Sequence, residues 1–191
     1  MKRIGLLPLA FAAMLAVACG DRARDESAVG TSGTEVDRGD KTYLEELIAG
    51  NMAEVEFGKL ATEKASNPEV KRFAQMLVRD HTQAVQDLKQ IASGHFQPPT
   101  QLPEDARDTM DRLSKLRGNE FDREFVDVMV EKHEDTVDKL ENRVDNGRAE
   151  TDKDHLGARV NQFAAKALPT VRRHLEEAKR LDAMLGKRTT Y

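Results

Sequence analysis

Apolar residues recur at helical spacing in four long segments of the chain. Between Lys41 and Ser66 they fall three or four residues apart, beginning with Leu44, Leu47 and Ile48. The same spacing returns over about 68–93, 120–145 and 152–186. Such a period is typical of amphipathic helices that bury one face. We therefore expect four long helices packed around a shared core.

The breaks between these segments carry helix-capping signals. Asn67 can cap the second helix, Pro68 suits its first turn, and Glu69 favours the positive end of the helix dipole. A joint this short predicts an antiparallel hairpin of the first two helices. Asn146-Gly147 is a stop for the third helix, and Thr151 to Asp154 resembles a capping box for the fourth.

A longer crossover joins the second and third helices. The run from Gly94 to Pro99 stops one helix, Pro103 starts a short helix to about Leu116, and Gly118-Asn119 breaks the chain again. Pro169 lies inside the fourth helix and should kink it. With 34% charged residues, 5% aromatic residues and no tryptophan, the composition also favours an all-α protein. The prediction is a ferritin-like antiparallel four-helix bundle with a short extra helix in the crossover.

The N-terminus resembles that of a bacterial lipoprotein. Lys2 and Arg3 precede an apolar run that is too short to span a membrane comfortably, and Ala16-Val17-Ala18 precede Cys19, the only cysteine. We predict a signal peptide over 1–18, lipidation of Cys19, and a polar tether over 19–40. The alternative is an ordinary secretory signal cleaved nearby. The helical domain is then 41–186, followed by a tail at 187–191.

This reading predicts a location in the cell envelope. Several acyl chains on Cys19 would anchor a periplasm-facing domain, and Gly20 rather than Asp after the cysteine favours the outer membrane over the inner one, by resemblance to enteric lipoproteins. Losing Lys2 and Arg3 changes the formal charge from −4 to −6. A net acidic domain argues against nucleic-acid binding.

Histidines interrupt the apolar stripes of three different helices. They are His81 in VRDH, His133 in VEKH and His174 in VRRH. At a rise of about 1.5 Å per residue, Glu54 and His81 lie about 20 Å from the first hairpin joint. Counted from Asn146, His133 is consistent with the same layer, whereas counting from Thr151 places His174 one or two turns away.

This layer has two competing interpretations. Three imidazoles and Glu54 could bind Fe, Zn, Mn or Cu, with Glu56 or Asp80 as alternative ligands. Alternatively, Glu54 accepts hydrogen bonds from His81 in a metal-free polar network that fixes helix register, which is the interpretation that the sequence favours. The positions three before each histidine are Val78, Val130 and Val171, so the Glu-x-x-His pairs of di-iron bundles are absent. No catalytic triad, phosphate-binding loop or Cys-x-x-Cys is present.

The chain resembles the bacterial domain-of-unknown-function family 4142 over about residues 42–185. Its matching motifs are Gly-x-Leu-Ala, Asp-His, Met-x-x-x-His and Leu-Pro-x-x-x-x-His-Leu, in that order. They comprise Gly58, Leu60, Ala61, Asp80, His81, Met129, His133, Leu168, Pro169, His174 and Leu175. The resemblance implies an exported, ferritin-like helical protein, often labelled an outer-membrane protein, and no established activity.

Three functions follow from the sequence. The first is a non-catalytic envelope or stress-associated protein without a cofactor, and the second is a metal-binding or redox protein that uses the His/Glu layer. The third is an interaction module that docks an envelope partner through the crossover over 94–116 or an exposed groove. Nothing in the sequence points to an enzyme, and nothing defines an oligomeric state.

Overall fold

The computed structural model describes residues 37–145 and 155–186, and all regular structure within them is helical. The elements are α1 (Arg38–Lys64), α2 (Pro68–Ala92), α3 (Glu104–Lys115), α4 (Gly118–Asp145) and α5 (His155–Gly186). Four long helices and a short one in the crossover confirm the predicted all-α class. Cys19, the stop at Asn146-Gly147 and the capping box at Thr151 lie outside the described residues.

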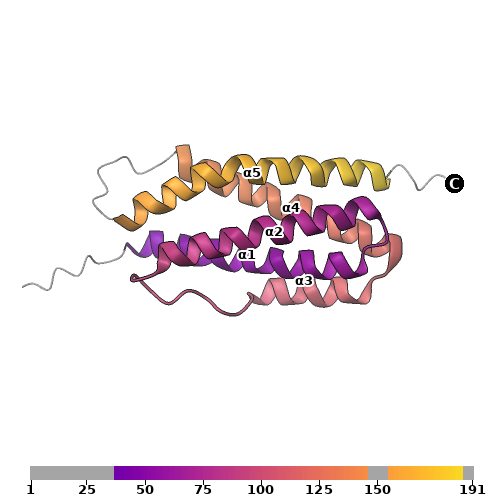
Figure 1. Ribbon diagram of the computed structural model, residues 1–191, viewed down its shortest axis with the longest axis horizontal. Coiled ribbons are helices and arrows are strands. Elements are labelled where there is room, and N and C mark those ends of the chain that lie inside the picture. Colours follow the sequence, from indigo (N-terminus) through magenta and orange to yellow (C-terminus); the bar gives the residue numbers. More distant parts are fainter. Residues whose placement is uncertain (1–36, 146–154, 187–191) are drawn as a thin grey trace, which may run out of the picture. The chain divides into compact units, whose positions relative to one another are not determined.

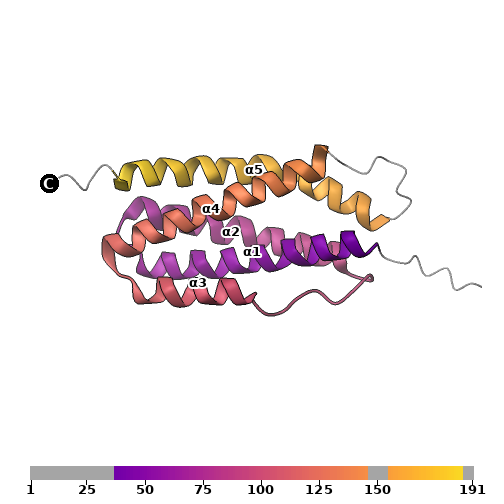
Figure 2. The ribbon, with the colours of Figure 1, turned by 180° about the vertical axis from the view of Figure 1, so that it is seen from behind.

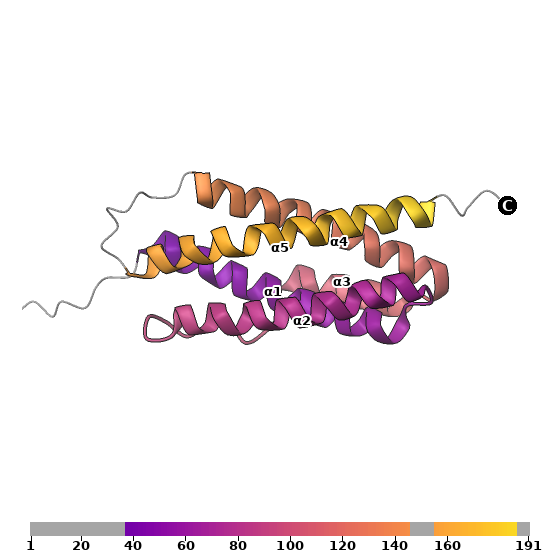
Figure 3. The ribbon, with the colours of Figure 1, turned by 45° about the horizontal axis from the view of Figure 1, so that its top comes forward.

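The long helices associate as two neighbouring pairs. Figures 1 and 3 show α1 beside α2 and α4 beside α5, and α2 also contacts α5. Seen from behind, α3 runs beside α1 (Figure 2). Gly58 allows the close approach of α1 to α2, because a Cβ there would lie 2.8 Å from Val78 Cγ2 and 3.1 Å from the Ala74 oxygen. No helix of the described part is long and apolar enough to cross a membrane.

The helix boundaries largely follow the predicted signals. The Asn67 side chain caps α2 by accepting the amide of Glu69, with Pro68 at the first position. Gly94 and Gly118 have positive φ values of 85° and 56°, which glycine tolerates, at the two breaks around the crossover. The helix α1 begins at Arg38, three residues before Lys41, because Asp37 caps it. The helix α5 continues through Pro169 and changes direction along its length (Figure 1).

A buried carboxylate holds the joint between α1 and α2. Asp122 on α4 has no exposed surface and accepts the amide of Ser66 at 3.0 Å, the amide of Asn67 at 2.8 Å and the Ser66 hydroxyl. Backbone amides of a short joint have no partners in a helix, so a carboxylate that reaches them is a substitute. Asp122 thereby fastens the first hairpin to α4.

The hydrophobic core is divided into two clusters. One surrounds Phe57, Leu77, Met129 and Ala178, and the other surrounds Ile48, Leu88, Val137 and Val171. In each cluster these four residues come from α1, α2, α4 and α5, respectively. On α2, α4 and α5 the histidine falls between the buried residues of the two clusters, and on α1 Glu54 follows Ala53 at the edge of the first cluster. A buried polar layer therefore crosses an otherwise apolar interior.

Candidate metal centre

The three stripe histidines meet in one layer. His81, His133 and His174 are buried, and the distances between their ring centroids are 5.6 Å, 5.3 Å and 5.4 Å. Each ring offers one nitrogen, and these nitrogens all lie within 4.8 Å of one another. The expectation that His174 would lie a turn or two off the layer was wrong. It counted from Thr151, whereas α5 begins at His155, a difference of four residues or about one turn.

Glu54 completes the layer from α1. Its Oε2 lies 3.0 Å from Nε2 of His81 and 3.4 Å from Nε2 of His133, and the residue is only 6% exposed. Two ligand atoms at about 2.0–2.1 Å from a tetrahedral ion are themselves about 3.4 Å apart. The distances from the Glu54 oxygen to the two imidazole nitrogens are therefore close to the distance between two ligand atoms of one metal ion.

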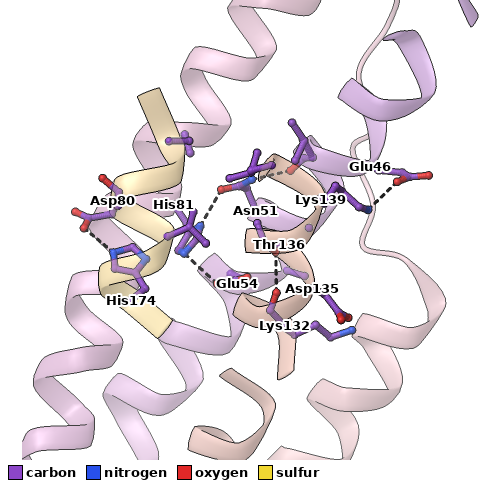
Figure 4. Close-up of a pocket in the computed structure, with 18 of the residues that line it drawn as sticks. Glu46, Asn51, Glu54, Asp80, His81, Lys132, Asp135, Thr136, Lys139 and His174 are labelled. Carbon is purple, nitrogen blue, oxygen red and sulfur yellow. Dashed lines mark hydrogen bonds and ion pairs between the residues drawn. The ribbon is translucent and has the colours of Figure 1, made fainter. Parts of the chain in front are cut away.

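Hydrogen bonds on the outer side fix the tautomer of each ring. The Asn51 amide nitrogen donates to the Leu47 oxygen, so its oxygen faces Nδ1 of His81 at 2.8 Å. The Met129 carbonyl lies 2.9 Å from Nδ1 of His133. The Asp80 carboxylate lies 3.0 Å from Nε2 of His174, as Figure 4 shows. All three partners accept, so each of these ring nitrogens carries the hydrogen.

The remaining ring nitrogens face the interior, and each has a lone pair to offer a metal when its imidazole is neutral. They are Nε2 of His81, Nε2 of His133 and Nδ1 of His174, and each is buried without a hydrogen-bond partner. Glu54 Oε2 faces two of these nitrogens, Nε2 of His81 at 3.0 Å and Nε2 of His133 at 3.4 Å. Burying polar groups is costly, so one carboxylate and three imidazoles that converge from four helices require an explanation.

Protonation states in the layer suit a cation. Burial alone would raise the pKa of Glu54, but His133, His81 and His174 outweigh it and lower that pKa to about 2. Burial lowers the pKa of His133 despite the attraction of Glu54. Burial together with the neighbouring imidazoles lowers the pKa of His174 to about 4. The layer therefore holds one carboxylate and two imidazoles that are neutral at pH 7, which is the state metal ligands need.

The pKa of His81 shifts in the opposite direction from those of His133 and His174. Burial disfavours its charged form, yet Glu54 and then Asp80 outweigh this and raise the pKa of His81 above its usual value. In the metal-free layer a proton on His81 therefore balances the Glu54 carboxylate. A metal ion would take the place of that proton.

Glu56 and Asp80, the alternative ligands predicted from the sequence, do not face the centre of the layer. Glu56 lies on the surface and pairs with Lys59 at 2.8 Å, so it is not part of the layer. Asp80 orients His174 from outside and is flanked by Arg79 at 2.9 Å and Arg173 at 3.5 Å. Despite its partial burial, the hydrogen bond from His174 and the nearby Arg79 hold the pKa of Asp80 below its usual value. The pattern of the sequence assigned no role to Asn51, although its position three residues before Glu54 places both on one helix face.

A cavity of about 340 Å³ opens beside the layer. Glu54, His81 and His174 line it, whereas His133 does not (Figure 4). Every helix contributes to its wall, including the start of α3 through Asp105 and Ala106. The layer therefore borders the cavity through three of its four residues, and His133 lies away from it.

Comparisons with known proteins agree on the fold. The family model described as Domain of unknown function (DUF4142) matches residues 25–181. A DUF305 protein from Streptomyces coelicolor has 15% identity and a TM-score of 0.62, with 77% of this chain and 92% of that chain covered. The structure of CopM in its Cu(I)-bound form has 20% identity and a TM-score of 0.58, with 74% and 93% covered. No curated protein matches the chain.

Proposed function

We propose that this chain, which belongs to the DUF4142 family, binds one divalent transition-metal ion through His81, His133, His174 and Glu54. The observation that carries the proposal is the meeting of three buried imidazoles, whose nitrogens lie within 4.8 Å of one another, with a buried carboxylate oxygen that lies 3.0 Å from Nε2 of His81 and 3.4 Å from Nε2 of His133. The framework is the predicted ferritin-like antiparallel arrangement of α1, α2, α4 and α5.

The dimensions fit an ion after a small adjustment. Because the three nitrogens are no more than 4.8 Å apart, some point lies within about 2.8 Å of all of them, compared with about 2.0–2.1 Å for a Zn–N bond. Shifts of under about 1 Å bring the rings to bonding distance. Outer hydrogen bonds to Asn51, Met129 and Asp80 already hold the rings in the required tautomers, as the outer partners of metal-bound histidines do.

The donor set indicates the class of metal. Imidazole suits Zn, Cu, Fe and Ni, and a carboxylate adds a negative charge that favours a divalent over a monovalent ion. CopM, which shares the fold, was solved with Cu(I). Soft Cu(I) prefers sulfur ligands, and none belongs to this layer, so we place Cu(II) and Zn(II) ahead of Cu(I) here.

Metal content tests the proposal directly. Protein lacking residues 1–20 and purified without an affinity tag is incubated with Cu, Zn, Fe or Mn, and bound metal is measured by mass spectrometry. We expect close to one ion per chain in the wild type and almost none in the His81→Ala/His133→Ala double variant. The matched control is His95→Ala, a histidine of the crossover. Equal metal in the wild type and the double variant would contradict the proposal.

The outer partner of His174 predicts a graded effect. Asp80→Asn keeps the size of the side chain but weakens the acceptor for His174 Nε2. Loss of such a partner typically lowers metal affinity by about 10–100-fold. A competition titration with a chromophoric chelator measures this, and Asp138→Asn on the exposed face of α4 serves as control. Unchanged affinity in Asp80→Asn would remove Asp80 from the site.

An envelope location is part of the proposal. It rests on the sequence around Cys19 and would place the metal centre in the periplasm, where a lipid anchor holds the domain near the membrane. Incorporation of labelled palmitate into the wild type and its absence in Cys19→Ser is the expected result. Label retained in Cys19→Ser would contradict lipidation at this residue.

An interaction module has less support. Among the described residues the exposed large hydrophobic side chain is Val144, at 38% exposure, at the end of α4. A docking surface is usually a contiguous apolar patch of several hundred Å². A protein partner of the envelope therefore stays a prediction from the sequence.

A further inference from the structure

We infer that the bound ion keeps a coordination position open toward the cavity, and that this position takes a small monoanionic ligand. The inference rests on the proposed metal site and adds to it an access route and a class of ligand. Three features carry it, namely which ligands face the cavity, how much space the cavity offers, and how charge is balanced around it.

Access to the ion is one-sided. The cavity is lined by Glu54, His81 and His174, so an ion held by these residues is in reach of its contents. His133 has no exposed surface and does not line the cavity, so it closes the opposite side. Structural zinc sites are closed by four protein ligands, whereas a site with an accessible side can add an exogenous ligand or exchange Glu54 for one.

The space limits the ligand to a small molecule. A volume of about 340 Å³ is at the lower end of the roughly 300–1,000 Å³ typical of small-molecule sites. Small side chains on three helices leave this space free, because Ala53, Ala84 and Ala167 line the wall together with Gly50. The residues of the layer that line this space are Glu54, His81 and His174, all of which would hold the ion, so a ligand in the cavity would lie beside the ion.

The net charge that a ligand meets in the cavity is set mainly by the bound ion. Three lysines line the cavity, and each lies near a carboxylate: Lys139 is 2.8 Å from Glu46, Lys132 is 3.3 Å from Asp105, and Lys166 is 3.9 Å from Asp87. These pairs largely cancel. A divalent ion with three neutral imidazoles and one carboxylate retains a net charge of +1, which one monoanion neutralises.

Multiply charged anions are disfavoured at the same place. Asp135 adds negative charge to the wall, whereas the charge of Asp80 is offset by Arg79 and Arg173. Like charges in a partly enclosed space repel more strongly than in water. The cavity therefore suits hydroxide, azide or a small carboxylate better than sulfate or phosphate.

Azide binding to the Cu(II)-loaded protein tests this inference. Cu(II) is chosen because it has the highest affinity among divalent ions of its row for such ligands. Azide on copper gives a charge-transfer absorption band and changes the electron paramagnetic resonance spectrum. We expect both to saturate at one azide per copper, and we expect sulfate not to compete.

Gly50→Leu tests the route through the cavity. A Cβ at Gly50 meets nothing within 4 Å, so a side chain can be introduced there, and we expect a leucine to narrow the cavity that Gly50 lines. We expect copper content to stay the same and the azide affinity to fall at least about tenfold. Gly186→Leu, at an equally open position at the end of α5, is the matched control and should leave azide binding unchanged.

The outcomes separate this inference from the proposed function. One copper per chain with no response to azide would overturn the open position and leave the metal site standing. Absence of bound copper would overturn both. Equal azide affinity in Gly50→Leu and the wild type would overturn the cavity as the route, and effective competition by sulfate would overturn the assignment to a monoanion.

Discussion

Saturation with Cu(II) or Zn(II) is expected to raise the free energy of unfolding of the wild-type domain by about 4 kcal/mol at a free metal concentration about a thousandfold above Kd. The reason is that the four ligands come from α1, α2, α4 and α5, and only the folded state brings them together. Metal binding therefore adds directly to folding free energy. Urea denaturation followed by circular dichroism, with metal and with chelator, measures the increment.

The increment should depend on Glu54. In Glu54→Gln the side chain keeps its size but loses the charge that balances the ion, so we expect most of the increment to disappear. Glu56→Gln is the matched control, because Glu56 pairs with Lys59 on the surface. A metal-dependent increment of the same size in Glu54→Gln as in the wild type would show that the metal binds elsewhere.

Asp122→Ala is expected to destabilise the domain by about 3 kcal/mol, whether or not metal is bound. Each hydrogen bond to a charged group contributes about 1.5–3 kcal/mol, and donors left without partners add a further cost. The substitution removes the acceptor for the Ser66 and Asn67 amides and the Ser66 hydroxyl, at a position without exposed surface. The midpoint and slope of urea denaturation in the presence of chelator give the change.

Asp138→Ala is the control for this prediction. It lies on the same helix as Asp122 but on the exposed face, where substitutions usually change stability by less than about 0.5 kcal/mol. A loss below about 1 kcal/mol in Asp122→Ala would mean that water replaces the carboxylate at the joint. Because Asp122 is remote from the histidine layer along α4, metal stoichiometry should not change.

The helical spacing of apolar residues predicted the helix boundaries and the buried faces, which depend on nearby residues in the sequence. Asn67 and Pro68 mark the start of α2, and the stripes place His81, His133 and His174 on buried faces. Glu54 was distinguishable from Glu56 for the same reason, since it lies nearer the apolar stripe. These features depend on neighbours three or four residues away, so a single sequence contains them.

The relations between helices were harder to predict. The position of His174 along the bundle axis depends on where α5 begins. The helix begins at His155 rather than just after Thr151, which shifts the expected position of His174 by about one turn. The contacts of Asp80 with His174 and of Asp122 with Ser66 join residues 94 and 56 positions apart. No periodicity encodes such pairs, because they arise from how the helices pack.

The most direct test of the metal centre is a crystal structure of the Zn(II)-loaded domain with anomalous diffraction recorded on both sides of the zinc absorption edge. The account predicts one anomalous peak bounded by Nε2 of His81, Nε2 of His133, Nδ1 of His174 and the Glu54 carboxylate, at bond lengths of about 2.0–2.2 Å. A peak at other residues, or an empty layer with a hydrogen bond between His81 and Glu54, would contradict it and leave the histidines as a structural network.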